Sequence, residues 1–266
     1  QGDGPDDPDP LSCAMARLHG VGVDPISGDV FVGDSETHKI RKITGLPGEK
    51  PLSRKPISSY ETESFSLNGR DCRIVKPEVV APGKPWIWRA RFFGAFPSLD
   101  EALLSQGWHL AWIDVSHLFG APEAVAAMDQ LYEQGVANHG LNPKPVLEGF
   151  SRGGLGAMNW AIQNPDKVSG IYLDAPLLEI RSWPRNASAK LWVKAMEAYG
   201  LNEDSLDDWK GPLDGVSTLL THEIPLCLIA GGNDEVVPFS ENGALLEQIY
   251  RENGGSLFSI INAGAG

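Results

Sequence analysis

The feature that most constrains the fold is a short glycine-rich run between two apolar segments. Residues 146–150 have the composition of a buried strand. Their last two residues begin the run Gly149-Phe150-Ser151-Arg152-Gly153. The apolar side chains that follow are spaced three or four positions apart, as on one face of a helix, at Leu155, Met158 and Ile162. A strand that turns directly into a helix leaves room only for small residues two positions before and after the turn. The run therefore predicts a strand, a sharp turn at Ser151 and a helix.

A serine held at such a turn is a candidate nucleophile. Its hydroxyl must be exposed, close to a base and next to N–H donors that stabilise an oxyanion. The sharp turn would expose Ser151, and the first amides of the following helix would face the developing negative charge. We expect the amide of Arg152 to be one donor, and the amide of Gly94 or Ala95, after an earlier strand, to be the second. The alternative is a glycine-rich turn without chemistry.

From residue 61 onward, strand-like apolar runs alternate with amphipathic stretches. The runs cover residues 71–75, 85–93, 109–115, 144–148, 169–174, 224–230 and 256–261. Alternation of this kind predicts a mostly parallel central sheet with helices on both faces. The long segment 177–220 interrupts it, and we expect a helical cap insertion there, the alternative being additional scaffold.

A catalytic acid is expected after a strand downstream of the serine. Asp234 follows the run 224–230 in the loop Gly231-Gly232-Asn233-Asp234-Glu235, where an acid would orient a histidine. The alternative is an aspartate that only caps the next helix. Asp174, at the end of the preceding strand-like run, is the reserve acid.

The histidine of such a triad is not found where this chain order places it. All six histidines precede Asp234, at positions 19, 38, 109, 117, 139 and 222. We assign none of them as the base and expect the base beyond Gly266, so that this chain is a fragment of a longer protein and close to inert alone. His117 and Trp183 are expected to line the pocket. Arg89 and Arg91 would need acidic partners if buried, and a structural ion pair is favoured over substrate binding.

The first 60 residues differ from the rest. Residues 1–10 are almost entirely Gly, Pro and Asp, and we expect residues 1–17 to be disordered or a linker. Residues 18–45 contain three short apolar runs separated by turn residues, which predicts a β-meander. This stretch resembles one blade of an NHL-repeat propeller, with Gly20-Val21-Gly22-Val23-Asp24-Pro25 and Ile40-Arg41-Lys42-Ile43 as the matching motifs. A hairpin packed on the main domain is the alternative, and residues 46–60 are expected to be a linker.

Composition excludes some classes of partner. The chain has 266 residues and a formal net charge of −13, without a cluster of Lys and Arg, which argues against nucleic acid. No apolar run is long enough to insert in a membrane. Three widely spaced cysteines indicate neither disulfides nor a metal site, and we expect no cofactor. Because the chain starts at Gln1 without a leader, its compartment stays open, with a periplasmic or secreted location as an option.

Residues 61–266 resemble a group of bacterial α/β hydrolases, often described only as hydrolases or esterases. The matching stretches are Cys72-Arg73-Ile74-Val75-Lys76-Pro77, residues 85–94, residues 149–154, Asp174-Ala175-Pro176, Ser182-Trp183-Pro184 and residues 234–238. The resemblance implies the α/β-hydrolase fold, Ser151 and Asp234 as catalytic residues, and a histidine after the last strand that is absent from this sequence. We expect hydrolysis of small or carbohydrate-linked carboxylic esters through an acyl-serine. One departure is Ala95, where relatives have a polar residue. The alternative function is a binding or surface protein with an accessory or inactive hydrolase-like domain.

Overall fold

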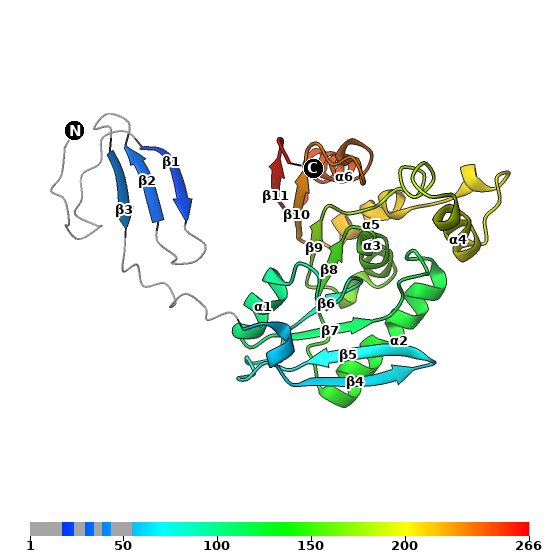
Figure 1. The fold of residues 1–266 in the computed structure, drawn as a ribbon, viewed down its shortest axis with the longest axis horizontal. Helices are drawn as coiled ribbons and strands as arrows, with labels where there is room; N and C mark the ends of the chain where they lie inside the picture. The colour runs from blue at the N-terminus through cyan, green and yellow to red at the C-terminus, as the bar shows by residue number, and fades with distance from the viewer. Residues whose placement is uncertain (1–17, 24–29, 35–38, 44–54, 266) are drawn as a thin grey trace. The chain divides into compact units, whose positions relative to one another are not determined.

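The computed structural model describes residues 18–23, 30–34, 39–43 and 55–265, and the chain divides into two units, Gln1–Arg54 and Lys55–Gly266 (Figure 1). In the first unit, three antiparallel strands pair in the order β1 (Leu18–Val23), β2 (Val30–Asp34) and β3 (Lys39–Ile43). This is the β-meander that the sequence predicts. The resemblance to a propeller blade stays a prediction, and the expected disorder over 1–17 and most of the expected linker lie outside the described residues.

The second unit is built on a sheet of eight strands. Its order is β11-β10-β9-β8-β6-β7-β5-β4. Neighbouring strands are parallel throughout the part of the sheet that runs from β11 through β6 to β7. These strands span β6 (Trp86–Arg89), β7 (His109–Ile113), β8 (Val146–Phe150), β9 (Gly170–Asp174), β10 (Leu226–Gly231) and β11 (Leu257–Asn262). The expected mostly parallel sheet of an α/β-hydrolase fold is confirmed.

An antiparallel hairpin closes one edge of this sheet. β4 (Thr62–Leu67) and β5 (Arg70–Val75) are joined by Asn68 and Gly69, both with positive φ of 47° and 80°. Two residues of this conformation form the turn that matches the twist of paired strands, and Asn-Gly is a favoured sequence for it. β4 was not among the expected strands, because its alternate side chains are polar and half of it faces water.

Helices cover both faces of the sheet. α2 (Pro122–His139), α3 (Gly153–Gln163), α5 (Val216–Thr221) and α6 (Gly243–Glu252) bury the larger core, which includes Trp88, Met128, Leu147, Trp160, Leu219 and Leu246. On the other face, α1 (Ser98–Ser105) packs over a smaller cluster that contains Ile57, Val75, Ile87, Leu104 and Leu110. No helix in the described part of the chain is both long and apolar enough to cross a membrane.

The segment 177–220 forms α4 (Ala189–Tyr199) and α5, with short 3-10 turns at Leu206–Asp208 and Pro212–Gly215. Its first part buries a separate apolar cluster with Phe119, Leu155 and Val237 as partners from outside the insertion. Its last part differs, because Val216 and Leu219 belong to the larger core. The part of the segment outside the main core therefore ends before α5.

β11 lies at the edge of the sheet and exposes apolar side chains. Phe258 and Ile260 are 61% and 49% exposed, and they pair in register with Cys227 and Ile229 of β10. Among the described residues, β10 is the only strand paired with β11.

Candidate active site

The turn at Ser151 has the strained geometry that the sequence predicts. Ser151 has φ of +49°, a conformation that costs a residue other than glycine about 1–3 kcal/mol. Its amide donates to the Asp174 carbonyl at 2.8 Å, and its carbonyl accepts from the amides of Gly154 and Leu177, both at 2.9 Å. Three backbone hydrogen bonds from two neighbouring segments therefore hold Ser151 in a conformation that it would not adopt alone.

The glycines around the serine are required by close packing. A Cβ on Gly149 would lie 2.7 Å from the Leu173 side chain and 2.9 Å from the Cα of Gly154. A Cβ on Gly153 would lie 3.3 Å from the Cβ of Arg91, just after β6. β8 and α3 thus approach each other closely on one side, and α3 begins against the chain that leaves β6 on the other.

The two expected sources of oxyanion donors differ in the structure. Arg152 immediately precedes α3, and its amide has no backbone acceptor in the described residues, whereas the amide of Gly154 already donates to the Ser151 carbonyl. The amide of Ala95, in contrast, donates to the carbonyl of Phe92 at 3.0 Å, so Ala95 is not a free donor in this conformation. This corrects the expectation for Ala95, because the chain turns sharply here, with φ of +56° at Phe92 and +79° at Gly94.

One buried arginine shapes this loop. The Arg89 Nε donates to the carbonyls of Arg91 and Phe92, both at 3.1 Å, and its Nη2 donates to the carbonyl of Ala95. These hydrogen bonds hold the chain that leaves β6 folded around the Arg89 side chain. The expected strand 85–93 ends at Arg89 for the same reason, since the loop turns around this side chain.

The Arg89 guanidinium is neutralised within the core, as expected for a buried arginine. Its Nη1 lies 2.5 Å from Asp100 on α1 and 2.7 Å from Glu148 on β8, and all three side chains are at most 3% exposed. Burial and the neighbouring carboxylate of Asp100 raise the pKa of Glu148 well above its usual range. One oxygen of each carboxyl has no hydrogen-bond partner in the described residues, and the raised pKa of Glu148 means that this carboxyl binds a proton more readily.

Asp234 lies in the loop after β10 and begins the next turn. Its Oδ1 accepts from the amides of Val236 and Val237 at 2.8 and 2.9 Å, which is also what a purely structural aspartate would do. The loop pairs with the chain after β11, since Gly232 donates to Asn262 at 2.8 Å and Asn233 to Ala265 at 2.9 Å. Residues that follow β11 are therefore held beside the Asp234 loop.

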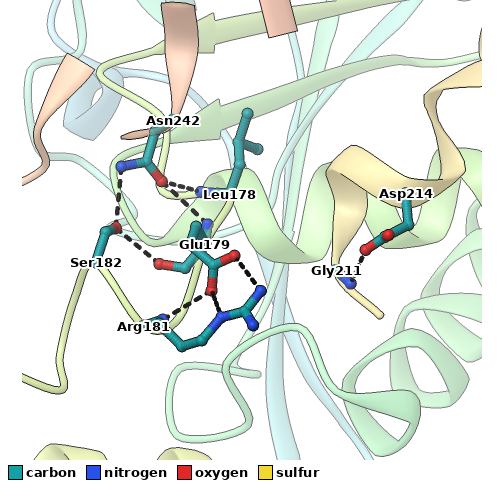
Figure 2. A network of polar contacts seen from close by, with 7 residues as sticks. All are labelled: Leu178, Glu179, Arg181, Ser182, Gly211, Asp214 and Asn242. Atoms are coloured by element: carbon teal, nitrogen blue, oxygen red, sulfur yellow. Dashed lines mark hydrogen bonds and ion pairs between the residues drawn. The ribbon is translucent and has the colours of Figure 1, made fainter. Parts of the chain in front are cut away.

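A buried asparagine, which the sequence did not single out, hydrogen bonds to the backbone of Leu178 and Glu179 and to the side chain of Ser182 (Figure 2). Asn242 is fully buried, and its Oδ1 accepts from the amides of Leu178 and Glu179 at 2.8 and 3.0 Å. Its Nδ2 donates to Ser182 Oγ at 3.0 Å and to the Pro238 carbonyl at 2.9 Å. The amide of Leu177, next to this network, donates to the carbonyl of Ser151.

Asp174 lies close to Ser151 in the backbone but directs its side chain elsewhere. It lines a cavity of about 140 Å³ together with Arg89, Glu148 and Tyr172. Burial raises the pKa of Asp174, and Arg89 offsets this only in part.

None of the four histidines whose side chains are described hydrogen bonds or ion pairs with Ser151 or Asp234. His109 is buried at the start of β7, and His117 is exposed after β7, near Asp114. His139 ends α2 within 3.7 Å of Glu63, and His222 follows α5 within 3.6 Å of Asp166. His117 does not line any of the described cavities, so its expected role in a pocket stays a prediction.

Trp183 lies beside Arg152, the residue that follows Ser151. The guanidinium carbon of Arg152 is 5.2 Å from the ring centre of Trp183 and 4.7 Å from that of Phe119. The side chain of Arg152 therefore stacks on two aromatic rings, one of them from the insertion.

No protein-family model and no curated protein matches the sequence. Among solved structures, the chain is similar to the Pyrococcus horikoshii acylaminoacyl peptidase, with a TM-score of 0.62, 16% identity and 95% of this chain covered. A puromycin hydrolase gives a TM-score of 0.61 at 17% identity over 94% of this chain. The chain spans only 46% and 42% of these two proteins.

A shorter structure is matched over most of its own length. Mycobacterium tuberculosis MPT51 gives a TM-score of 0.57 at 17% identity, with 78% of this chain and 90% of that chain covered. At these identities the comparisons show the α/β-hydrolase fold.

Replacement of Ser151 by glycine should stabilise the protein. Glycine adopts positive φ without strain, so the free energy of unfolding should rise by about 1 kcal/mol after the extra chain entropy of glycine is subtracted. Urea unfolding measures this change. The matched control is Ser58→Gly, at an exposed serine in a 3-10 turn, which should lower stability by about 0.5–1 kcal/mol. Equal losses in both variants would show that the Ser151 turn is unstrained.

Replacement of Glu148 by glutamine should change how stability depends on pH. A raised pKa in the folded state means that wild type loses stability as the pH rises above the normal range of a glutamate, because only the unfolded chain ionises. The glutamine keeps the acceptor for Arg89 and cannot ionise, so the advantage of Glu148→Gln over wild type should grow between about pH 5 and 8. Urea unfolding across this range tests it, with the exposed Glu133→Gln as control. An advantage that shrinks as the pH rises would contradict a raised pKa of Glu148 in the folded protein.

Replacement of Asn242 by alanine should destabilise the fold strongly. It leaves the buried amide of Leu178, the half-buried amide of Glu179 and the half-buried carbonyl of Pro238 without their partner, at about 1–3 kcal/mol each, so we expect a loss of at least ~3 kcal/mol. The control is Asn253→Ala, an exposed asparagine after α6 whose Nδ2 donates to Ile249, with a loss below ~1 kcal/mol. Similar losses in the two variants would contradict a bracing role for Asn242.

Proposed function

We propose that this chain is the catalytic part of a serine hydrolase that cleaves carboxylic esters through an acyl-Ser151 intermediate. The observation that carries the proposal is the positive φ of Ser151, held by hydrogen bonds from Asp174, Gly154 and Leu177. Strain that the surroundings impose on a single hydroxyl residue is typical of a functional site. Its position between β8 and α3 is that of the nucleophile in the α/β-hydrolase fold.

In the proposed reaction, Ser151 Oγ attacks the ester carbonyl carbon while a histidine accepts its proton. The amide of Arg152 and an amide of the loop that Arg89 shapes, such as that of Gly94, stabilise the oxyanion. The alcohol leaves with the proton from the histidine, and water then releases the acid from Ser151 by the reverse sequence of proton transfers. Asp234 orients the histidine and stabilises its charged form.

The base in this proposal comes from residues that follow Ala265 in the longer protein. None of the four described histidines contacts Ser151 or Asp234, and backbone hydrogen bonds hold the chain after β11 next to the Asp234 loop. A histidine a few residues further on would therefore start from a position beside its acid.

The test is turnover of p-nitrophenyl acetate and labelling by a fluorophosphonate in the full-length protein. Ser151→Ala should abolish both, and Asp234→Asn should lower kcat about 10⁴-fold, because the histidine loses the charge that orients it. Asp174→Asn is the matched control and should cost less than about tenfold.

Two results would overturn parts of this proposal. If the wild type turned over p-nitrophenyl acetate no faster than Ser151→Ala, the proposal of a serine hydrolase would be wrong. If kcat fell more in Asp174→Asn than in Asp234→Asn, the serine hydrolase would stand but Asp174 would be its catalytic acid.

A further inference from the structure

Arg152 carries a charge beside the nucleophile that the protein leaves without a counter-ion. Its side chain stacks between Phe119 and Trp183, and its Nε and Nη1 are buried without a hydrogen-bond partner in the described residues. Burial lowers the pKa of Arg152 to about 10, which still leaves it charged at neutral pH. Stacking on aromatic rings fixes the plane of a guanidinium but satisfies none of its N–H groups.

Arg91 places a second uncompensated charge next to the first. Its Nη1 donates to the Ser116 carbonyl, and its Nε is buried without a partner among the described residues. Burial and the charge of Arg152 lower the pKa of Arg91 to about 10, whereas Asp114 acts in the opposite direction. Two guanidinium groups that repel each other are thus held in one place.

The other arginines show that this pair is unusual in the described part of the chain. Most of them have a carboxylate partner within ion-pair distance, namely Arg70, Arg89, Arg181, Arg185 and Arg251. Neither Arg91 nor Arg152 forms an ion pair with a described carboxylate. Both side chains are half-buried, and a guanidinium nitrogen that is shielded from water without a partner is unfavourable. In a chain with net charge −13, acidic residues are abundant. The missing partner is therefore expected to arrive with a ligand.

The space between the two arginines fits an anionic oxygen. A cavity of about 10 Å³ is lined by Arg91, Arg152, Ser116, Phe119 and Gly153. A cavity of this size admits one water or one oxygen atom of a larger group. It also lies at the first turn of α3, whose dipole adds positive potential.

We infer that Arg91 and Arg152 form a carboxylate subsite beside Ser151, and that the preferred substrate is an ester carrying a free carboxylate close to its scissile bond. This inference rests on the proposed ester hydrolysis and narrows its substrate class. One carboxylate oxygen enters the cavity and accepts from the unpartnered nitrogens, while Trp183 and Phe119 keep the Arg152 fork in place. The charge pair then selects anionic over neutral esters of the same length.

The first experiment compares matched esters in the full-length protein. On the acyl side, mono-p-nitrophenyl succinate, glutarate and adipate are compared with p-nitrophenyl butanoate, pentanoate and hexanoate. On the alcohol side, 4-acetoxybenzoate is compared with 4-acetoxybenzamide. We expect kcat/KM for the best anionic ester to exceed that of its neutral match at least tenfold, and the series that shows it tells which side carries the carboxylate.

Substitution of the arginines should remove that preference. Arg152→Met and Arg91→Met keep an apolar stem without the charge, and each should lower the ratio of anionic to neutral kcat/KM at least tenfold. Arg73→Met is the matched control, because Arg73 also stacks on two rings, those of Phe93 and Trp112, away from this cavity. Its ratio should equal that of wild type.

A binding measurement separates failure of the subsite from failure of the hydrolase. Calorimetry on Ser151→Ala measures the affinity for glutarate and for neutral glutaramide without turnover, and adding Arg152→Met should weaken glutarate binding at least tenfold. If esters are cleaved without an anionic preference and glutarate does not bind, the subsite is wrong and the hydrolase stands. If no ester is cleaved but glutarate binding depends on Arg152, the subsite stands and the hydrolase is wrong.

Discussion

A single buried guanidinium, that of Arg89, holds together the parts of this molecule that matter for chemistry. It neutralises carboxyls from α1 and β8 and fixes three carbonyls of the loop after β6. β8 leads into Ser151 within three residues of Glu148. β8, the loop after β6 and α1 are therefore all bound to the Arg89 guanidinium. Loss of any one charged partner would leave an uncompensated charge in the interior, which is strongly destabilising.

The two sides of the candidate site have opposite electrostatic character. On the α1 side, Glu148, Asp100 and Asp174 outnumber their one cation, and burial favours their protonated forms. On the α3 side, Arg91 and Arg152 form no ion pair with a described carboxylate, and Asp114 offsets the charge of Arg91 only in part. The serine turn lies on the boundary between these regions. The positive potential at this boundary therefore comes from the α3 side, where Arg91 and Arg152 keep their charge at neutral pH.

The parts of the fold that local sequence encodes were predictable, and the parts that depend on distant partners were not. Gly149 and Gly153 around Ser151 report a steric requirement within one turn of chain, so the strand, turn and helix follow from the sequence. The role of Asn242 depends on amides more than sixty positions away in sequence, and a lone asparagine in a helix start has no signal for that. The engaged amide of Ala95 likewise follows from Arg89, whose reach no periodicity shows. That buried arginines need acidic partners was foreseeable, whereas the absence of one at Arg91 was not.

The outer strand of the sheet has a consequence for how this chain behaves in solution. β11 presents Phe258 and Ile260 to water and has an edge with unpaired backbone groups among the described residues. Both features favour association of one strand edge with another. The described unit should therefore self-associate more as its concentration rises. Sulfate or phosphate should increase this association, because both salts strengthen apolar burial. The substitution Ile260→Lys would oppose that association without altering any residue near Ser151.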